Sequence, residues 1–153
     1  MITRRRLLGA AAAAAAVPTA GCSGALGEDT DESADDPDGV RLDELSIQNA
    51  HDSEHRIQLA VEADDEMLHL GAYDLDDEGE RTVEGAWTDT PGSYRVHVTL
   101  DDGAVRTADI VDSVGSEASC ARVLVRIGTD GELGIWTGAN CGPDADDGDL
   151  GSV

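Results

Sequence analysis

Residues 94–100 read YRVHVTL, and this stretch decides the fold. Its apolar positions, from Tyr94 to Leu100, are separated by single polar residues. Strict alternation with a period of two is typical of a strand that buries one face and exposes the other. We therefore predict a half-buried strand, with Tyr94 and Val96 pointing into a core and His97 pointing outward.

The same period of two recurs on both sides of this stretch. Further alternating runs lie at 45–47, 57–62, 68–70, 83–87, 105–111 and 123–127. Turn signals rich in Asp, Gly and Pro separate the runs at 77–79, 91–92, 101–103 and 130–131. No run keeps a helical period over about ten residues. We therefore predict that residues 41–141 form an all-β domain, an antiparallel β-sandwich of seven or eight short strands.

The first 22 residues carry the features of an export signal. Adjacent arginines, Arg4 and Arg5, precede an alanine-rich apolar core, and small residues lead up to Cys22. The core at residues 7–17 would span only about 16 Å as a helix, roughly half of a bilayer's hydrocarbon thickness. We predict that residues 1–21 are a signal peptide with a lipobox, cleaved before Cys22, and that Cys22 carries a lipid. The alternative is an ordinary secretory signal with a chance cysteine at its end.

Acidic residues dominate the rest of the chain. Residues 22–153 hold all 33 acidic residues against seven arginines and no lysine, which gives a formal charge of −26. Such a surface repels nucleic acid, so we predict no nucleic-acid partner. It suits solubility in high salt, where the screening length falls to about 3 Å at 1 M. Acid also dominates residues 22–40, a predicted disordered linker, and residues 142–153, a predicted flexible tail.

The chain resembles exported lipoproteins of halophilic archaea. The resemblance rests on the adjacent arginines, the Thr19–Cys22 box, the dispersed acidic residues and the absence of lysine. It implies export of the folded domain by the twin-arginine route. It also implies a lipid anchor in the cell membrane through Cys22, with the domain on the extracellular side.

A second resemblance concerns the domain itself. Residues 82–100, which include Trp87, Pro91, Gly92 and Tyr94, resemble the later strands of immunoglobulin-like modules on prokaryotic surfaces. It implies an immunoglobulin-like sandwich. The Cys-Trp-Cys core of true immunoglobulins is absent, because the domain's two cysteines both follow Trp87.

Two cysteines remain once Cys22 is assigned to the lipid. Cys120 and Cys141 form an even pair outside the reducing cytosol. If Asp130 and Gly131 make a two-residue turn, the two cysteines face each other directly in a pair that brings side chains close. We therefore predict a Cys120–Cys141 disulfide. The alternative is two free buried thiols.

The aromatic residues allow two interpretations. Trp87, Trp136 and Tyr94 could form a binding patch, or they could belong to the core. In the hairpin register given above, Trp136 shares a face with Val123 and Val125. This register favours the core.

Metal-binding patterns are few. His51 and His55 are the candidate metal ligands, since zinc is often held by histidine. A pair four residues apart converges on a helix, however, whereas this pair lies in a turn entering a strand, which favours plain surface histidines over a metal site. Residues 74–79 match the start of a calcium loop, but Gly85 stands where the closing glutamate is required. Weak binding of divalent cations and a simply solvated acidic surface both stay open.

No catalytic motif stands out. The serines show no nucleophile turn and the glycines form no phosphate loop, so we predict a non-enzyme without a cofactor. We predict a membrane-tethered cell-surface lipoprotein that acts as a non-catalytic binding or envelope-structural module. Its partner would be an unidentified surface protein or solute. The alternative is an accessory protein that binds a metal ion or a small solute near a membrane complex.

Overall fold

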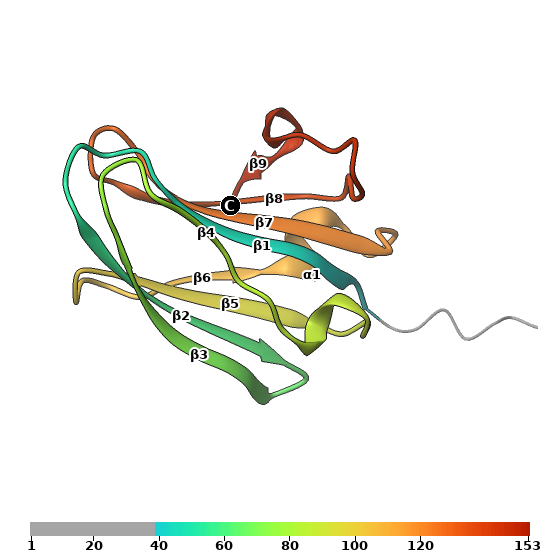
Figure 1. Ribbon diagram of the computed structural model, residues 1–153. Coiled ribbons are helices and arrows are strands. Elements are labelled where there is room, and N and C mark those ends of the chain that lie inside the picture. The colour runs from blue at the N-terminus through green and yellow to red at the C-terminus, as the bar shows by residue number, and fades with distance from the viewer. Residues whose placement is uncertain (1–38) are drawn as a thin grey trace, which may run out of the picture. The chain divides into compact units, whose positions relative to one another are not determined.

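Two β-sheets lie face to face in the part of the chain that the computed structural model describes, residues 39–153 (Figure 1). The first sheet has the strand order β4-β1-β7-β8-β9, and the second has the order β3-β2-β5-β6. The strands are β1 (Arg41–Asn49), β2 (His55–Ala63), β3 (Glu66–Leu75), β4 (Glu80–Thr82), β5 (Tyr94–Leu100), β6 (Arg106–Asp109), β7 (Cys120–Ile127), β8 (Leu133–Gly138) and β9 (Gly151–Ser152). Three short helices connect them: η1 (Ala86–Thr88), α1 (Ile110–Val114) and η2 (Asp147–Asp149). The predicted all-β sandwich is confirmed.

One strand pairing differs from the predicted antiparallel pattern. β1 runs parallel to β7, with Leu45 beside Val123 and Ile47 beside Val125. The other strand pairings within residues 39–153 are antiparallel. The whole second sheet separates β1 from β7 along the chain, so no hairpin sets their relative direction. Two very short strands, β4 and β9, are additional to the predicted set because two or three residues cannot display alternation. The alternating run at 83–87 is not a strand, since η1 occupies its second half.

The core lies between the sheets and is built from the alternating residues. In β5, Tyr94, Val96 and Val98 are buried. His97 points outward as predicted, with Nδ1 2.9 Å from the Thr107 hydroxyl. The other sheet contributes Leu45 and its alternating neighbours from β1, together with inward-facing residues of β7 and β8. The alternation in YRVHVTL therefore predicted the buried and exposed faces of β5 correctly.

Tyr94 and Trp87 belong to the core and not to a binding patch. The Tyr94 hydroxyl donates to the Thr90 carbonyl at 2.5 Å, which is the corner arrangement found in immunoglobulin sandwiches. Burial raises the pKa of Tyr94, and the nearby negative charge of Asp64 raises it further. Trp87 is 1% exposed, and its ring covers Gly85, where any side chain would overlap it.

The hairpin between β7 and β8 corrects the predicted register. Its loop is longer than two residues: the Gly128 N–H donates to the Glu132 carbonyl at 2.8 Å, and Gly131 takes a positive φ of 78°. Ile127 therefore pairs with Leu133, one position away from the predicted register. A one-residue shift moves every side chain to the other face.

Trp136 shows the consequence of this shift. It pairs with Leu124 on the outer face of the first sheet and is only partly buried. Its predicted core position was wrong. Cys120 and Cys141 lie beyond the last pair of the ladder, Arg122 with Gly138, and still form the predicted disulfide with their Cα atoms 6.5 Å apart.

The segment from residue 142 to the C-terminus differs from the flexible tail that its acidity predicts. Ser152 in β9 pairs with Trp136 in β8, and the Val153 N–H donates to the Ile135 carbonyl at 2.9 Å. Arg122, which is 7% exposed, donates to the Asp146 carbonyl and to Asp147 Oδ1, both at 3.1 Å. A buried guanidinium needs such acceptors, and here the acidic segment provides them.

The N-terminal predictions fall mostly outside the described residues. Arg4, Arg5, Cys22 and the linker up to residue 38 are not described. Val40, placed in the linker by the sequence, is 1% exposed and pairs with Gly92, so the sandwich begins one residue earlier than predicted. None of the helices described between residues 39 and 153 has the length and apolar character needed to cross a bilayer.

Candidate functional site

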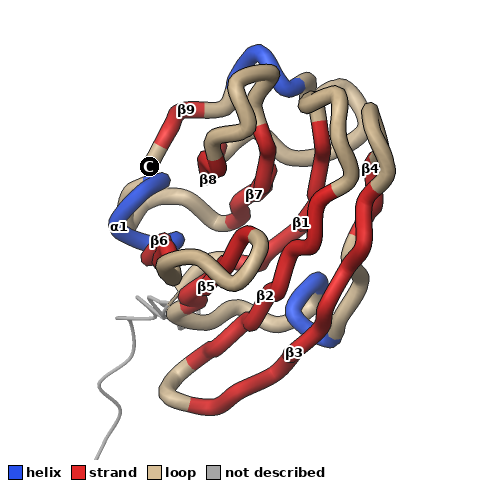
Figure 2. Tube along the Cα trace, turned by 90° about the vertical axis from the view of Figure 1, so that its left-hand side faces the viewer, coloured by secondary structure: helices blue, strands red, loops and turns tan. Residues whose placement is uncertain are grey.

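The edge strand β3 exposes large apolar side chains. Leu70 is 75% exposed, Met67 55% and Leu68 40%, although large apolar residues elsewhere are mostly buried. β3 is ten residues long and stands at the border of the second sheet, where it pairs with β2 (Figure 2). Residues 67–73 carry no charged side chain. We call this stretch the β3 edge.

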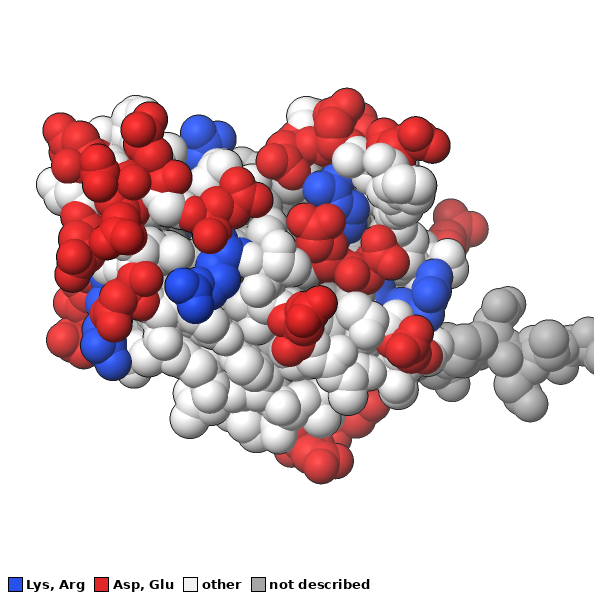
Figure 3. Space-filling view, in the orientation of Figure 1, with Lys and Arg blue, Asp and Glu red and all other residues white. Residues whose placement is uncertain are grey.

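The uncharged character continues across the second sheet. Leu70 lies opposite Ala60 in β2, and Ala60 lies opposite His97 in β5. In the next row, Ala72 lies opposite Gln58. Figure 3 shows the result as an uncharged area over β3, whereas acidic side chains crowd the opposite side of the same view.

Charged residues at the two ends of this area are paired with one another. At one end, Glu62 accepts from Arg95 Nη1 at 3.1 Å and lies 3.2 Å from His97 Nε2. At the other end, Arg56 Nη1 lies 3.2 Å from Asp74 Oδ1, and both side chains are more than half exposed. The area between them is therefore uncharged, and ion pairs stand at both of its ends.

The inner side of β3 is held in place by aromatic contacts. His69 Nε2 lies 2.8 Å from the Tyr73 hydroxyl, and the His69 ring meets Trp87 edge-on with centroids 5.5 Å apart. Gly71 lies beneath both side chains, and a Cβ there would stand 2.8 Å from the Tyr73 hydroxyl oxygen. Trp87 Nε1 is the one buried side-chain N or O atom of the described residues that finds no hydrogen-bond partner. These contacts hold the inner side of β3 against the core.

The loop between β1 and β2 brings His51 and His55 together. His51 Nδ1 lies 2.7 Å from His55 Nε2, and His55 Nδ1 lies 2.5 Å from Asp101 Oδ2. Asp101 Oδ1 also accepts from the Arg56 N–H at 2.8 Å. Burial raises the pKa of Asp101, but the bonds from Arg56 and His55 outweigh it, so the pKa lies below its ordinary value.

The His51–His55 cluster is arranged as a hydrogen-bonded network. The facing nitrogens of His51 and His55 are at hydrogen-bonding distance, and Asp101 bonds the other nitrogen of His55. Within residues 39–153, no group of three or more His, Cys, Asp or Glu side chains is placed to hold an ion. Metal binding by His51 and His55 stays a prediction.

A buried asparagine, which the sequence analysis did not single out, orders the neighbouring loops. Asn49 is fully buried; its Nδ2 donates to the Ser53 carbonyl at 2.8 Å and to the Asp76 carbonyl at 2.9 Å. Its Oδ1 accepts from the His51 N–H at 3.0 Å. The loop matched to a calcium site is thus tied to Asn49 through the Asp76 carbonyl. The only sequence signal was a polar residue that ends the apolar run of β1.

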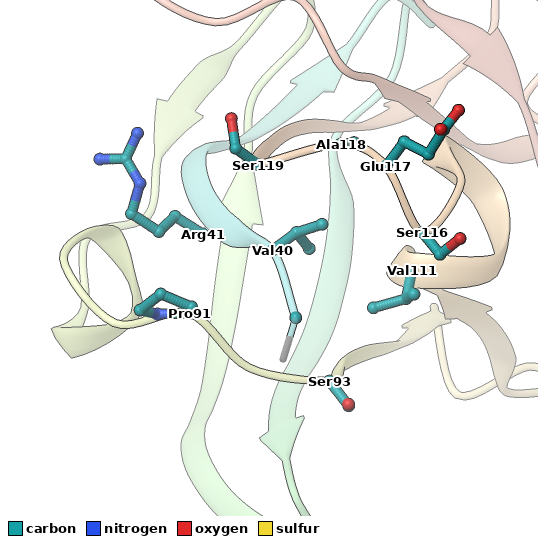
Figure 4. A pocket seen from close by; sticks show the side chains of 10 residues that line it. Val40, Arg41, Pro91, Ser93, Val111, Ser116, Glu117, Ala118 and Ser119 are labelled. Atoms are coloured by element: carbon teal, nitrogen blue, oxygen red, sulfur yellow. The ribbon is translucent and has the colours of Figure 1, made fainter. Parts of the chain in front are cut away.

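A hollow of about 770 Å³ lies at the end of the sandwich where β1 begins, beside Gly39. In Figure 4, Val40 and Val111 face each other across it, while the polar ends of Arg41 and Glu117 point away. Serines form much of the remaining lining. Among the described residues that line the hollow, no base lies beside a nucleophile.

Comparison with known proteins finds a family model that matches this chain. The family model described as the halobacterial Ig-like domain matches residues 53–142, which is more than half of the chain and includes the β3 edge and both disulfide cysteines. No curated protein and no solved structure matches the chain.

Proposed function

The chain belongs to the halobacterial Ig-like domain family, and we propose that it is a non-catalytic module, displayed outside the cell on a lipid tether at Cys22, that binds through the β3 edge. Sandwiches of this kind serve as structural or binding modules, and their specificity lies in exposed faces and loops. The proposal therefore depends on which surface is built to be contacted.

The β3 edge is the observation that carries the proposal. Residues 39–153 hold 26 acidic residues, yet none falls within residues 67–73. Three large apolar side chains are exposed on this stretch. An apolar surface bounded by charge is the usual mark of an interaction site, because leaving it in water has a cost that binding removes.

The tether is supported by the sequence at the N-terminus. The adjacent arginines and the Thr19–Cys22 box suit export and lipidation. The chain between Cys22 and Val40, where packing begins, could reach roughly 60 Å at full extension. A domain on such a connection can lie well outside the membrane surface.

Replacing the lipidated thiol tests the proposal in the native host. The Cys22→Ser variant should move from the membrane fraction to the medium, because a stable anchor requires the lipid chains. The matched control replaces Arg4 and Arg5 by lysine, which should block export and leave unprocessed protein inside the cell. Retention of Cys22→Ser in the membrane fraction would contradict the tether.

A further inference from the structure

We propose that the β3 edge pairs with the β3 edge of a second copy of this chain, so that two second sheets join into one continuous sheet. The inference rests on the proposed binding role of this edge and names its partner. The side chains that meet in this pairing lie in the uncharged area around Leu70 and Ala72.

The β3 edge lacks the devices that usually prevent such pairing. Edge strands are normally short, or they carry charge or proline. Among the described strands, β4 has three residues and β9 has two, and the four-residue β6 begins with Arg106. β3 has ten residues and no proline, and its uncharged run covers seven of them. Only the irregular pairing near Met67 and Leu68 interrupts its regular geometry.

The sequence of β3 suits pairing with itself. An antiparallel pair about a two-fold axis at Leu70 places Leu70 against Leu70 of the other copy. Ala72 then lies against Leu68, and His69 lies against Gly71. Apolar side chains meet apolar side chains, and the smallest residue faces one of the larger ones.

Charge at the ends of the pair also allows this register. Asp74 of one copy would lie against Glu66 of the other, which alone would be repulsive. Arg56 lies 3.2 Å from Asp74 Oδ1 and is 56% exposed, so its guanidinium is free to contact both carboxylates. Each end of the paired strands therefore has its own cation.

Tethering favours this partner over a freely diffusing one. Copies held on one membrane face have a high effective concentration, which compensates for the small area of a strand-to-strand contact. Antiparallel pairing sends the two linkers from opposite ends of the pair. The roughly 60 Å available between Cys22 and Val40 lets both linkers return to the same membrane.

A single new cysteine tests the two-fold axis in the full chain. With Leu70→Cys, the two new thiols should face each other in the pair, within reach of a disulfide. We expect a reducible dimer on non-reducing gels of intact cells, several-fold above the background of Thr107→Cys. Thr107 is the matched control because it is exposed in β6, at the other edge of the same sheet.

Ala72→Cys controls the register. Its two copies would lie four positions apart along the strands, roughly 13 Å, too far for a disulfide. A dimer with Leu70→Cys alone supports the proposal. Dimer formation by neither variant, by Ala72→Cys in preference, or equally by Thr107→Cys would overturn it.

Salt gives an independent measurement. Two copies with a formal charge of −26 each repel one another, and added salt screens this repulsion while leaving apolar contact intact. The dimer fraction of Leu70→Cys should therefore rise with salt, and a fall would overturn the apolar contact. A membrane-bound chain that stays monomeric would reject only this inference, whereas release of the wild-type protein would reject the tether.

Discussion

The two sheets of the sandwich end in different ways. In the first sheet, the segment after residue 142 returns over β8, where β9 pairs with it and Arg122 binds Asp147. The Cys120–Cys141 disulfide joins the start of β7 to the chain just before this segment. In the second sheet, β3 pairs with β2 and leaves its other edge to solvent within the described part of the chain.

The difference indicates which side of the domain is structural and which is available. We call the edge of the first sheet at β9 and the disulfide the closed side, and the edge of the second sheet at β3 the open side. The closed side is held by a covalent bond and by a buried arginine, both insensitive to dilute salt. The open side has no covalent cross-link among the described residues, and its polar contacts include the bonds from Asp101 to His55 and from Arg56 to Asp74. Stability should therefore depend on the first side, and association on the second.

Removing the disulfide should destabilise the closed side, and we expect this variant to have the largest effect on the free energy of unfolding. The double variant Cys120→Ser, Cys141→Ser loses a cross-link between positions 21 residues apart. The unfolded chain then gains entropy, and we expect a loss of about 3 kcal/mol in the free energy of unfolding. Denaturant unfolding measures this loss. Leu70→Ser on the open edge is the control, with an expected change below about 0.5 kcal/mol. Equal losses in both variants would remove the distinction between the sides.

Arg122→Met tests the contacts of the buried guanidinium independently of the disulfide. The variant keeps most of the side-chain volume but removes the donors to Asp146 and Asp147. We expect a loss of about 1–2 kcal/mol, since the partners left behind are accessible to water. Amide exchange should become faster in residues 142–153. Arg126→Met, an exposed position four residues further along β7, should leave that exchange unchanged. Unaltered protection in Arg122→Met would show that β9 alone holds the segment.

Alternation predicted the sandwich well because burial of one strand face leaves a direct trace in the sequence. The disulfide was also predicted correctly, although the register of the β7–β8 hairpin was wrong. A disulfide can still form after a one-residue shift, whereas such a shift changes which face of the sheet a side chain lies on. Trp136 was misplaced for that reason: loop length between β7 and β8 depends on backbone bonds of Gly128 and Gly131 that the turn signal does not specify.

The candidate site was harder to predict. An exposed leucine and a buried leucine read alike in an alternating run, so the β3 edge became visible only when the strand order placed β3 at a border. The contact between His51 and His55 depends on the shape of the β1–β2 loop. Arg122 reads as one more surface charge until the C-terminal segment is seen to cover it.

Removing the hydrogen bonds of Asp101 at the open side should have the smallest effect on stability, and this effect should depend on pH. The pKa of Asp101 lies below its ordinary value of 3.8 in the folded protein. A carboxyl group with a lowered pKa stabilises the fold above that ordinary value, and its contribution disappears as the pH falls through the folded pKa. Asp101→Asn should thus reduce stability at neutral pH by no more than about 0.5 kcal/mol, because the group is largely exposed. Once the pH is below the folded pKa, the variant and the wild type should unfold alike. Asp102→Asn is the control, because Asp102 contacts only the Gln58 amide in this network, so it shows the general effect of removing one acidic charge from this turn. A difference for Asp101→Asn that is the same at acid and neutral pH would mean that its bonds to His55 and Arg56 do not stabilise this end of the second sheet.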